Sequence, residues 1–282
     1  MGTGNNLSVP TAPAYLACVA GGGTAATCNS PQNHVDSGLS LDIGTGAVKW
    51  AFRAMTWNNP FIADGSDNWN VACAVGFGPG QGNCPAGAGP DFDFASAPNL
   101  ITCASSTGKQ TILGAGEKSG IYYALNPDSG AVLWQTQVGP GSALGGMEWG
   151  SASDGQRIYV SIANLYGILT AVGGAGSWAA LNPQDGSILW QVADPNGAIA
   201  TGPLTVAGGV VFVSSMASSA TAPTMLALSG AIGQTLWSFA AGSSVNAGAS
   251  IVDGVVYWGS GYAHLGIPGY TTNNKFYAFS RD

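Results

Sequence analysis

Two aspartates separated by one residue are the feature of the sequence with the most evident chemistry. Asp91 and Asp93 lie in the run Gly89-Pro90-Asp91-Phe92-Asp93-Phe94, within a segment rich in Gly, Ala and Pro. Side chains alternate along an extended chain, so both carboxylates are expected to point the same way. Such carboxylates can accept a proton or bind a hard cation. The alternative is that both are turn or strand-edge carboxylates of a Gly/Pro-rich loop.

Four further polar or aromatic residues stand outside the regular patterns described below. Asn5, in Gly2-Thr3-Gly4-Asn5-Asn6, offers an amide carbonyl oxygen that suits Ca²⁺, or is a turn Asn with a positive φ. Lys118, in Gly116-Glu117-Lys118-Ser119-Gly120, is one of only seven basic residues and can stabilise an anionic ligand. Its alternative is a solvated turn lysine. Trp149 and Asn246 are candidates for lining a site.

The elements that must position these residues come from an internal repeat. Each copy is an apolar strand, a polar turn with Gly and a second strand that ends on Trp, at Trp50, Trp134, Trp190 and Trp237, and Phe276–Phe279 begins a fifth copy. The last two Trp intervals, 56 and 47 residues, fit one four-stranded blade each, which takes about 40–50 residues. The first interval is longer, and segment 57–90 supplies the excess as a loop insertion.

The repeat predicts an all-β fold, a single partial β-propeller domain over residues 1–282 with about four blades. Between the Trp residues lie short strands rich in β-branched and aromatic residues, bounded by Gly or Asp-Gly. One blade cannot bury both of its faces, so stacked neighbours form the core. We therefore expect the repeated Trp residues to join blades rather than bind a ligand. The two end blades are expected to lack a neighbour, which favours self-association or pairing with missing blades.

The cysteines predict two local disulfides. Cys18 and Cys28 form one pair, Cys73 and Cys84 a second, and Cys103 stays free. Each pair lies in a Gly/Ala/Pro-rich stretch, which suits disulfides closing long loops in an oxidising compartment. Five reduced thiols in a cytosolic protein are the alternative. Zinc is disfavoured because no CxxC pattern or nearby Cys/His grouping occurs in the sequence.

Composition excludes several classes of function. Charged residues make up 7% of the chain and the net charge is −7, without a basic cluster, so nucleic acid is an unexpected partner. No apolar run approaches the roughly 20 residues that span a bilayer. The first residues do not resemble a signal peptide, and we expect Met1 to be a start created by a cut. No Cys-x-x-Cys-His haem motif and no Rossmann glycine fingerprint occurs. His34 and His264 have no ligand spacing and are expected at the surface.

The repeats resemble the tryptophan-docking motif of propellers that bind pyrroloquinoline quinone (PQQ), the quinoprotein alcohol dehydrogenases. The resemblance covers nearly the whole chain and is closest to polyvinyl alcohol dehydrogenase-like proteins, through the segments 2–6, 89–94 and 116–120. It implies PQQ with Ca²⁺ or a lanthanide at the ring axis. Family members carry an adjacent-cysteine disulfide and a stacking Trp in earlier blades, and this chain supplies about half of such a ring. Non-catalytic scaffold propellers share the repeat.

The resemblance also implies roles for single residues. Asn5 falls at the family's metal ligand. Asp91, seven residues before Pro98, falls at the general base, and Asp93 at an extra metal ligand found in some relatives. An alignment through Trp69 would instead place Asn70 at the base and leave the site dead.

Three positions fall near the cofactor in the same comparison. Lys118 matches the cation beside the quinone oxygens. Glu148-Trp149 stands where relatives have Asn-Trp, so Trp149 is expected to line the cofactor site while Glu148 departs from the pattern. Asn246 is placed on the same rim.

Two functions are compatible with these residues. The first is PQQ-dependent oxidation of a secondary or polymeric alcohol, with electrons passed to an external cytochrome c or a dye, in the periplasm or outside the cell. The alternative is a scaffold or binding propeller that has lost the quinone site. In the enzyme, Asn5, Asp91 and Lys118 are expected to converge; in the scaffold, they scatter.

Overall fold

The computed structural model describes residues 1–6, 11–28, 30, 32–54, 69–75, 83–84, 89–105, 108–261 and 270–280. The chain forms two compact units, Met1–Ala95 with Pro127–Ala131, and Ser96–Asn126 with Val132–Asp282. His264 and most of the predicted insertion 57–90 lie outside the described residues. In the part that is described, no helix has the length and apolarity needed to cross a bilayer.

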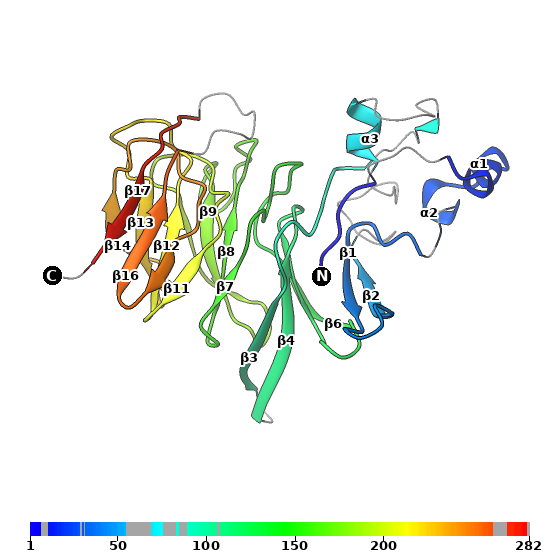
Figure 1. The fold of residues 1–282 in the computed structure, drawn as a ribbon, viewed down its shortest axis with the longest axis horizontal. Helices are drawn as coiled ribbons and strands as arrows, with labels where there is room; N and C mark the ends of the chain where they lie inside the picture. Colours follow the sequence, from blue (N-terminus) through cyan, green and yellow to red (C-terminus); the bar gives the residue numbers. More distant parts are fainter. Residues whose placement is uncertain are drawn as a thin grey trace. The chain divides into compact units, whose positions relative to one another are not determined.

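The first unit combines a hairpin with three short helices (Figure 1). Its elements are α1 (Pro13–Ala20), α2 (Ala25–Cys28), β1 (Ser37–Leu41), β2 (Val48–Arg53) and α3 (Asn70–Val75). Tyr15 of α1 packs edge-on against Trp69 with 5.3 Å between ring centroids, next to the buried Ala72 of α3. Trp69 is therefore a core residue of this helical part.

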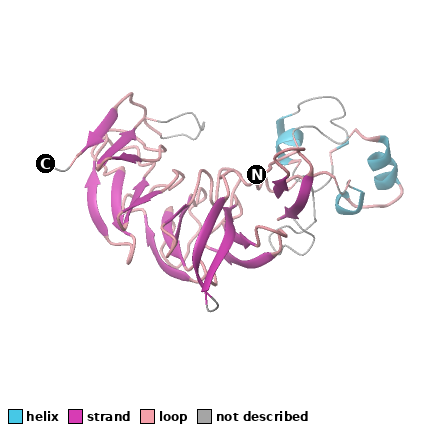
Figure 2. Ribbon diagram, turned by 60° about the horizontal axis from the view of Figure 1, so that its bottom comes forward, coloured by secondary structure: helices cyan, strands magenta, loops and turns pink. Residues whose placement is uncertain are grey.

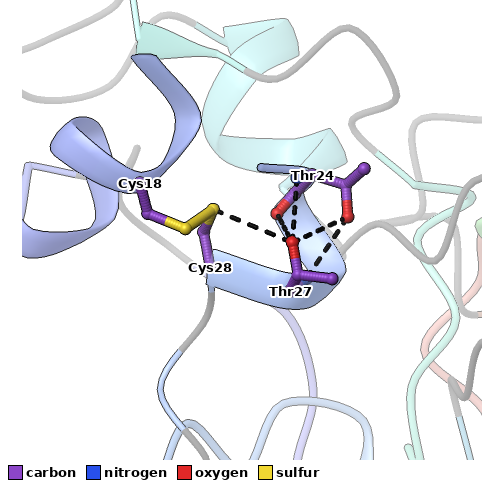
Figure 3. The surroundings of a disulfide bond; sticks show 4 residues. All are labelled: Cys18, Thr24, Thr27 and Cys28. Carbon is purple, nitrogen blue, oxygen red and sulfur yellow. Dashed lines mark hydrogen bonds between the residues drawn. A yellow bond between two sulfur atoms is a disulfide. The ribbon is translucent and has the colours of Figure 1, made fainter. Parts of the chain in front are cut away.

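Both predicted disulfides are present, and among the described cysteines Cys103 is free and buried. Cys18 lies in α1 and Cys28 in α2, so the first bridge joins two helices, while the second joins Cys73 of α3 to Cys84 outside the helix. Thr24 and Thr27 bond to each other beside the first bridge and close the turn before Cys28 (Figure 3).

The second unit consists of antiparallel sheets in sequence order, each a meander of consecutive strands (Figures 1 and 2). The first is β3 (Asn99–Ser105), β4 (Gly108–Gly116), β5 (Ile121–Leu125) and β6 (Val132–Gln137). The second is β7 (Ala152–Ser153), β8 (Ile158–Ile162), β9 (Ser177–Leu181) and β10 (Ile188–Ala193). The third is β11 (Thr205–Ala207), β12 (Val210–Ser214), β13 (Met225–Ser229) and β14 (Thr235–Phe239). The fourth is β15 (Ser250–Val252), β16 (Val255–Gly259) and β17 (Phe276–Phe279).

This architecture confirms the all-β propeller prediction, because three sheets of the second unit are four-stranded blades, the fourth has three described strands, and neighbouring sheets pack face to face. The central strands β5, β8 and β9 are buried along their whole length, as expected for strands covered on both faces. One core joins the first two sheets through Ile112, Tyr122, Ile158 and Leu181, and a second joins the next pair through residues such as Trp178 and Leu226. Whether the two units form a single domain stays a prediction.

The repeated Trp residues join each sheet to the next one. The Trp134 indole N–H donates to the Pro183 carbonyl at 3.0 Å, in the turn between β9 and β10. Trp190 donates in the same way to Gly230 at 2.9 Å, in the turn between β13 and β14. Within the first unit, Trp50 donates to Pro127 at 3.0 Å. Trp237 makes no such bond to a described residue and instead lies against Phe239 and Phe279, 38% exposed.

A glycine under the indole makes this contact possible. Gly186 has φ +74°, and a Cβ there would collide with the Trp134 ring. Gly233 has φ +73°, and its Cβ would come within 2.7 Å of the Trp190 ring. The turn therefore needs glycine for both its backbone conformation and the space beneath the indole.

The contact between indole and turn predicts that two glycine substitutions in the second unit lower the free energy of unfolding by different amounts. Gly186→Ala should destabilise the fold by about 3 kcal/mol, from left-handed strain and overpacking against Trp134. Gly254→Ala is the matched control: its φ is +79° but no atom lies within 4 Å of the added Cβ, so only the strain, about 1–2 kcal/mol, applies. Urea unfolding measures both. Equal losses would show that the ring does not press on the turn.

Asp194 is a buried carboxylate at the end of the β10 strand. It is 3% exposed; its Oδ1 accepts the N–H of Asn196 at 2.8 Å, while its Oδ2 is buried without a hydrogen-bond partner in the described structure. Burial raises the pKa of Asp194 to about 6, against the lowering effect of hydrogen bonds from Ser215 and Asn196. The folded state thus binds this proton more tightly than the unfolded state does.

Protonated Asp194 therefore stabilises the folded state, and this stabilisation decreases as the pH rises. Its contribution is fully present below the unfolded pKa near 4 and is lost as the pH rises through about 6. Relative to wild type, Asp194→Asn should gain on the order of 2 kcal/mol at pH 7.5 and nothing at pH 4. Urea titrations of both proteins across this range measure the difference. A difference that does not vary with pH would mean that the pKa of Asp194 is the same in the folded and unfolded states.

Candidate functional site

The polar site residues of the first unit are positioned by its first six residues. Leu39 donates its N–H to the Met1 carbonyl and Thr3 donates to Ser37, so this segment runs alongside β1. On its other side, Phe94 donates its N–H to the Thr3 carbonyl at 3.3 Å. The segment is held between β1 and residues 91–94, which fixes where Asn5 lies.

Asn5, Asp91 and Asp93 come together in this unit. The Asn5 amide donates a hydrogen bond to Asp91 Oδ1. The Asp93 carboxylate lies against the backbone of Gly4, where an added Cβ would come within 2.8 Å of Asp93 Oδ1. Gly4 thereby admits the second carboxylate beside the Asn5 backbone. The three predicted metal residues are neighbours, although their roles stay predictions.

The residues that the two alternative alignments place at the base lie in different surroundings. Trp69 is 3% exposed in the helical core, and the neighbouring Asn70 donates to the Gly89 carbonyl at 3.0 Å. Asp91, in contrast, directly accepts a hydrogen bond from Asn5. Asp91 also has φ +62°, a left-handed conformation that is uncommon for a residue with a Cβ, and is 8% exposed. Backbone strain of this kind clusters at functional sites.

The charged residues around the segment 1–6 are themselves buried. Asp36 is inaccessible to solvent and donates its N–H to the Gly4 carbonyl at 3.1 Å. Burial lowers the pKa of the Arg53 guanidinium, and the negative charge of Asp36 opposes this effect. In the described part of the chain, no three His, Cys, Asp or Glu side chains gather as a metal site. A metal held by Asn5, Asp91 and Asp93 would have two carboxylates and one amide oxygen as side-chain ligands.

Lys118 belongs to the second unit and is not a solvated turn lysine. It lies in the connection between β4 and β5 and is only 8% exposed. Its carbonyl accepts the N–H groups of Gly146 at 2.7 Å and Ser142 at 3.2 Å, which ties this turn to the segment before Trp149. Glu148, the departure from the family pattern, is also buried, at 6% exposure.

Trp149 and Asn246 line one cleft of the second unit, of about 680 Å³. Trp149 is 39% exposed there, so one part of its ring is available to a ligand. Thr201 donates to Asn246 Oδ1 at 2.6 Å, which sets the orientation of the amide. Lys118 is not among the described residues that line this cleft. The structure thus brings Trp149 and Asn246 together in the second unit, whereas Asn5, Asp91 and Asp93 belong to the first unit.

The sequence interpretation missed the small residues of this cleft. Pro203, Gly248 and Ser260 complete its wall with neighbouring backbone. Their signal was the recurrence of Gly-Pro and Ala-Gly pairs just before the first strand of a blade, at Gly202-Pro203 and Ala247-Gly248. Small residues there leave space that larger side chains would fill.

Comparisons with known proteins agree with the fold. A family model described as outer membrane protein assembly factor BamB matches residues 117–269, more than half of the chain. Polyvinylalcohol dehydrogenase from a Pseudomonas species is 33% identical over 255 residues, 81% of this chain and 36% of that protein. The enzyme of the same name from Sphingopyxis sp. (strain 113P3) is 36% identical over 162 residues, 57% of this chain and 23% of that protein. The chain thus spans about a third of these relatives or less.

Solved structures resemble the chain in fold. The quinohemoprotein alcohol dehydrogenase from Pseudomonas putida HK5 has a TM-score of 0.58 and 16% identity, and the match covers 81% of this chain and 39% of that one. A europium-containing methanol dehydrogenase has a TM-score of 0.52 and 13% identity, over 79% of this chain and 44% of that one.

The left-handed backbone at Asp91 generates a prediction about stability. Asp91→Gly and Asp91→Ala both remove the contact with Asn5, but only glycine adopts φ +62° without strain. The Gly variant should therefore be about 1 kcal/mol more stable than the Ala variant, despite its more flexible unfolded chain. Urea midpoints of the two variants measure the difference. An Ala variant at least as stable as the Gly variant would contradict the left-handed backbone.

Proposed function

The chain belongs to the PQQ-type β-propeller family related to the quinoprotein alcohol dehydrogenases, and we propose that it forms part of a PQQ-dependent dehydrogenase that oxidises an alcohol. The observation that carries the proposal is the grouping of Asn5, Asp91 and Asp93 in one unit. The similarity to two polyvinylalcohol dehydrogenases supports a secondary or polymeric alcohol as substrate. Because the chain spans about a third of them, the activity is proposed for an assembly with further blades.

The donor set fits a hard divalent or lanthanide cation. Two carboxylates and an amide carbonyl are oxygen ligands of the type that Ca²⁺ prefers. Asn5 and Asp93 would hold the ion, with Asp91 as a shared ligand. Gly4 is the part of the cradle that a larger side chain would fill, since an added Cβ would displace Asp93.

Asp91 is proposed as the general base. When bound, PQQ supplies the acceptor for the hydride equivalent that leaves the alcohol carbon. The protein must remove the hydroxyl proton, and a carboxylate oxygen of Asp91 would take it. The hydrogen bond from Asn5 fixes the orientation of this carboxylate relative to the segment 1–6.

Trp149, Asn246 and Lys118 are proposed as cofactor-binding residues. Trp149 offers an exposed ring face, and Asn246 offers an amide oriented by Thr201. Lys118 would supply a positive charge that stabilises the reduced, anionic quinol. An external cytochrome c is proposed as the electron acceptor. The two disulfides support a periplasmic or secreted location.

A non-catalytic scaffold is the second candidate. The observation that favours it is the family model described as an outer membrane assembly factor, which covers residues 117–269. A scaffold needs the docked sheets of the second unit but has no use for the grouping of Asn5, Asp91 and Asp93.

Asp91→Asn separates the two candidates in a propeller that contains this segment together with further blades. The amide cannot accept the hydroxyl proton, so reduction of a dye by an alcohol should fall by about 10²–10⁴-fold. Binding of PQQ in the presence of Ca²⁺ or a lanthanide, measured by equilibrium dialysis, should persist. Asp93→Asn is the matched control, with weaker metal binding as its main effect. Full turnover of Asp91→Asn would place the base elsewhere, and no PQQ binding by the wild type would support the scaffold.

A further inference from the structure

The second unit also holds a groove of about 500 Å³, separate from the Trp149 cleft. Its wall comes from three connections between strands, β8–β9, β10–β11 and β12–β13, and from Tyr270. None of the described residues that line it carries a charged side chain. Apolar groups such as Leu165 and Ile199 alternate with the polar groups of Asn196, Ser218 and Ser219. Burial raises the pKa of the Tyr270 hydroxyl to about 12, so that residue is neutral as well.

The groove and the cleft open on the same face of the unit. In a four-stranded antiparallel meander, the connection from the second to the third strand lies at one end of the strands. The connection from the last strand to the next sheet lies at that same end. The connections that line the two spaces are all of these two kinds. The β10–β11 connection lines both, through Asn196–Ile199 in the groove and Pro203 in the cleft. Ile199 and Pro203 are four residues apart along this connection, at most roughly 14 Å, so one long ligand can reach both spaces.

Hydrogen bonds hold the walls of the groove in place. Asn196 donates to the Pro223 carbonyl at 2.9 Å, and Met216 donates its N–H to the Ile199 carbonyl at 3.1 Å. Ser244 donates to the Met216 carbonyl, also at 3.1 Å. These bonds fix the backbone of the wall at Ile199 and Met216. A preformed groove loses little entropy on binding.

The loop that carries Leu165, a lining residue of the groove, has a hydrogen-bonded backbone and exposed apolar side chains. Buried Asn164 donates to the carbonyls of Ile168, Gly174 and Ala175 and accepts the Ile168 N–H at 2.9 Å. This network holds the loop while three large apolar side chains face solvent, with exposures of 67% for Tyr166, 48% for Ile168 and 85% for Leu169. Exposed apolar groups on a fixed backbone mark an interaction surface.

We infer that the groove lined by Asn196–Ile199, Ser218 and Tyr270 binds a remote part of a long, uncharged, hydroxyl-bearing carbon chain while its reacting hydroxyl lies at the Trp149 cleft. This inference rests on the proposed alcohol oxidation. Methylene groups of such a chain pack on the apolar wall, and its hydroxyls bond to Asn196, Ser218 and Ser219. A charged polymer would lose its hydration without gaining an ion pair. A small alcohol would occupy the cleft alone and leave the groove empty.

The inference is tested by binding, without any need for turnover. Isothermal titration of the chain with polyvinyl alcohol and with pentane-2,4-diol compares a polymer with its short repeating unit. Two linked contacts raise the effective concentration at the second one, so the polymer should bind at least about tenfold more tightly per hydroxyl. Equal affinity per hydroxyl, or no polymer binding, would overturn the inference.

Variants that fill the groove test whether the polymer binds there. Ser218→Trp places a large ring in the groove at a residue whose side chain is exposed, and should abolish the tenfold advantage of the polymer. Ser238→Trp, at an exposed position of the outer strand β14 outside the groove, is the matched control and should retain it. Ala222→Leu provides a smaller filling should Ser218→Trp fail to fold by circular dichroism. Polymer binding that survives in both groove variants would refute the assignment.

The outcome for the groove is distinguishable from that for the reaction. Dye reduction in the assembled propeller with PQQ reports the proposed oxidation alone. Selective polymer binding without dye reduction would support the groove assignment and refute the proposed oxidation. If polymer and diol bind equally and reduce the dye with equal efficiency, the proposed oxidation is supported and the groove assignment is refuted.

Discussion

The hydrogen bond from a strand-end indole to the turn of the next sheet sets the spacing on which the second unit depends. Trp134 and Trp190 make it with nearly equal geometry, to Pro183 and Gly230. A sheet of three or four strands has two apolar faces and cannot bury them alone, so it must be covered by its neighbours. The indole fixes the packing of neighbouring sheets at the strand ends that carry the turns with Pro183 and Gly230. The connections at the opposite strand ends are then free to vary, and they line both the Trp149 cleft and the 500 Å³ groove.

The first unit positions its polar residues by a different device. Its segment 1–6 contains no long apolar side chain after Met1, yet it is bonded on one side to β1 and on the other to residues 91–94. Glycine at positions 2 and 4 allows this close approach, since a Cβ at Gly2 would come within 2.7 Å of Phe94 and one at Gly4 would meet Asp93. Small residues thus place Asn5 beside Asp91. The two groups of candidate site residues belong to separate units.

The sequence predicted the elements whose signal is periodic. The strands that end on Trp and the strands before them follow from the alternation of residue types, and the two cysteine pairs follow from their spacing. The helices were not predicted, because a charge-poor, Gly-rich composition argues against them. Pro13 nevertheless begins α1, at a position where its missing N–H costs nothing. The 500 Å³ groove and the buried Asp194 depend on connections meeting across sheets, which no local pattern encodes. The contact between Asn5 and Asp91 joins residues 86 positions apart, so only the resemblance suggested it.

Because each docked indole links a sheet only to its immediate successor, the second unit is a one-dimensional array of coupled modules. In such an array the energy is a sum of module terms and nearest-neighbour terms, so unfolding proceeds inward from a boundary. The sheet β15–β16–β17 has three strands, and Trp237 beside it is still partly exposed. The described residues show no indole-to-turn bond between β11–β14 and β15–β17, so this junction should open before the two junctions that have one. The connections around Trp149, deeper in the array, would keep their shape while the last sheet fluctuates.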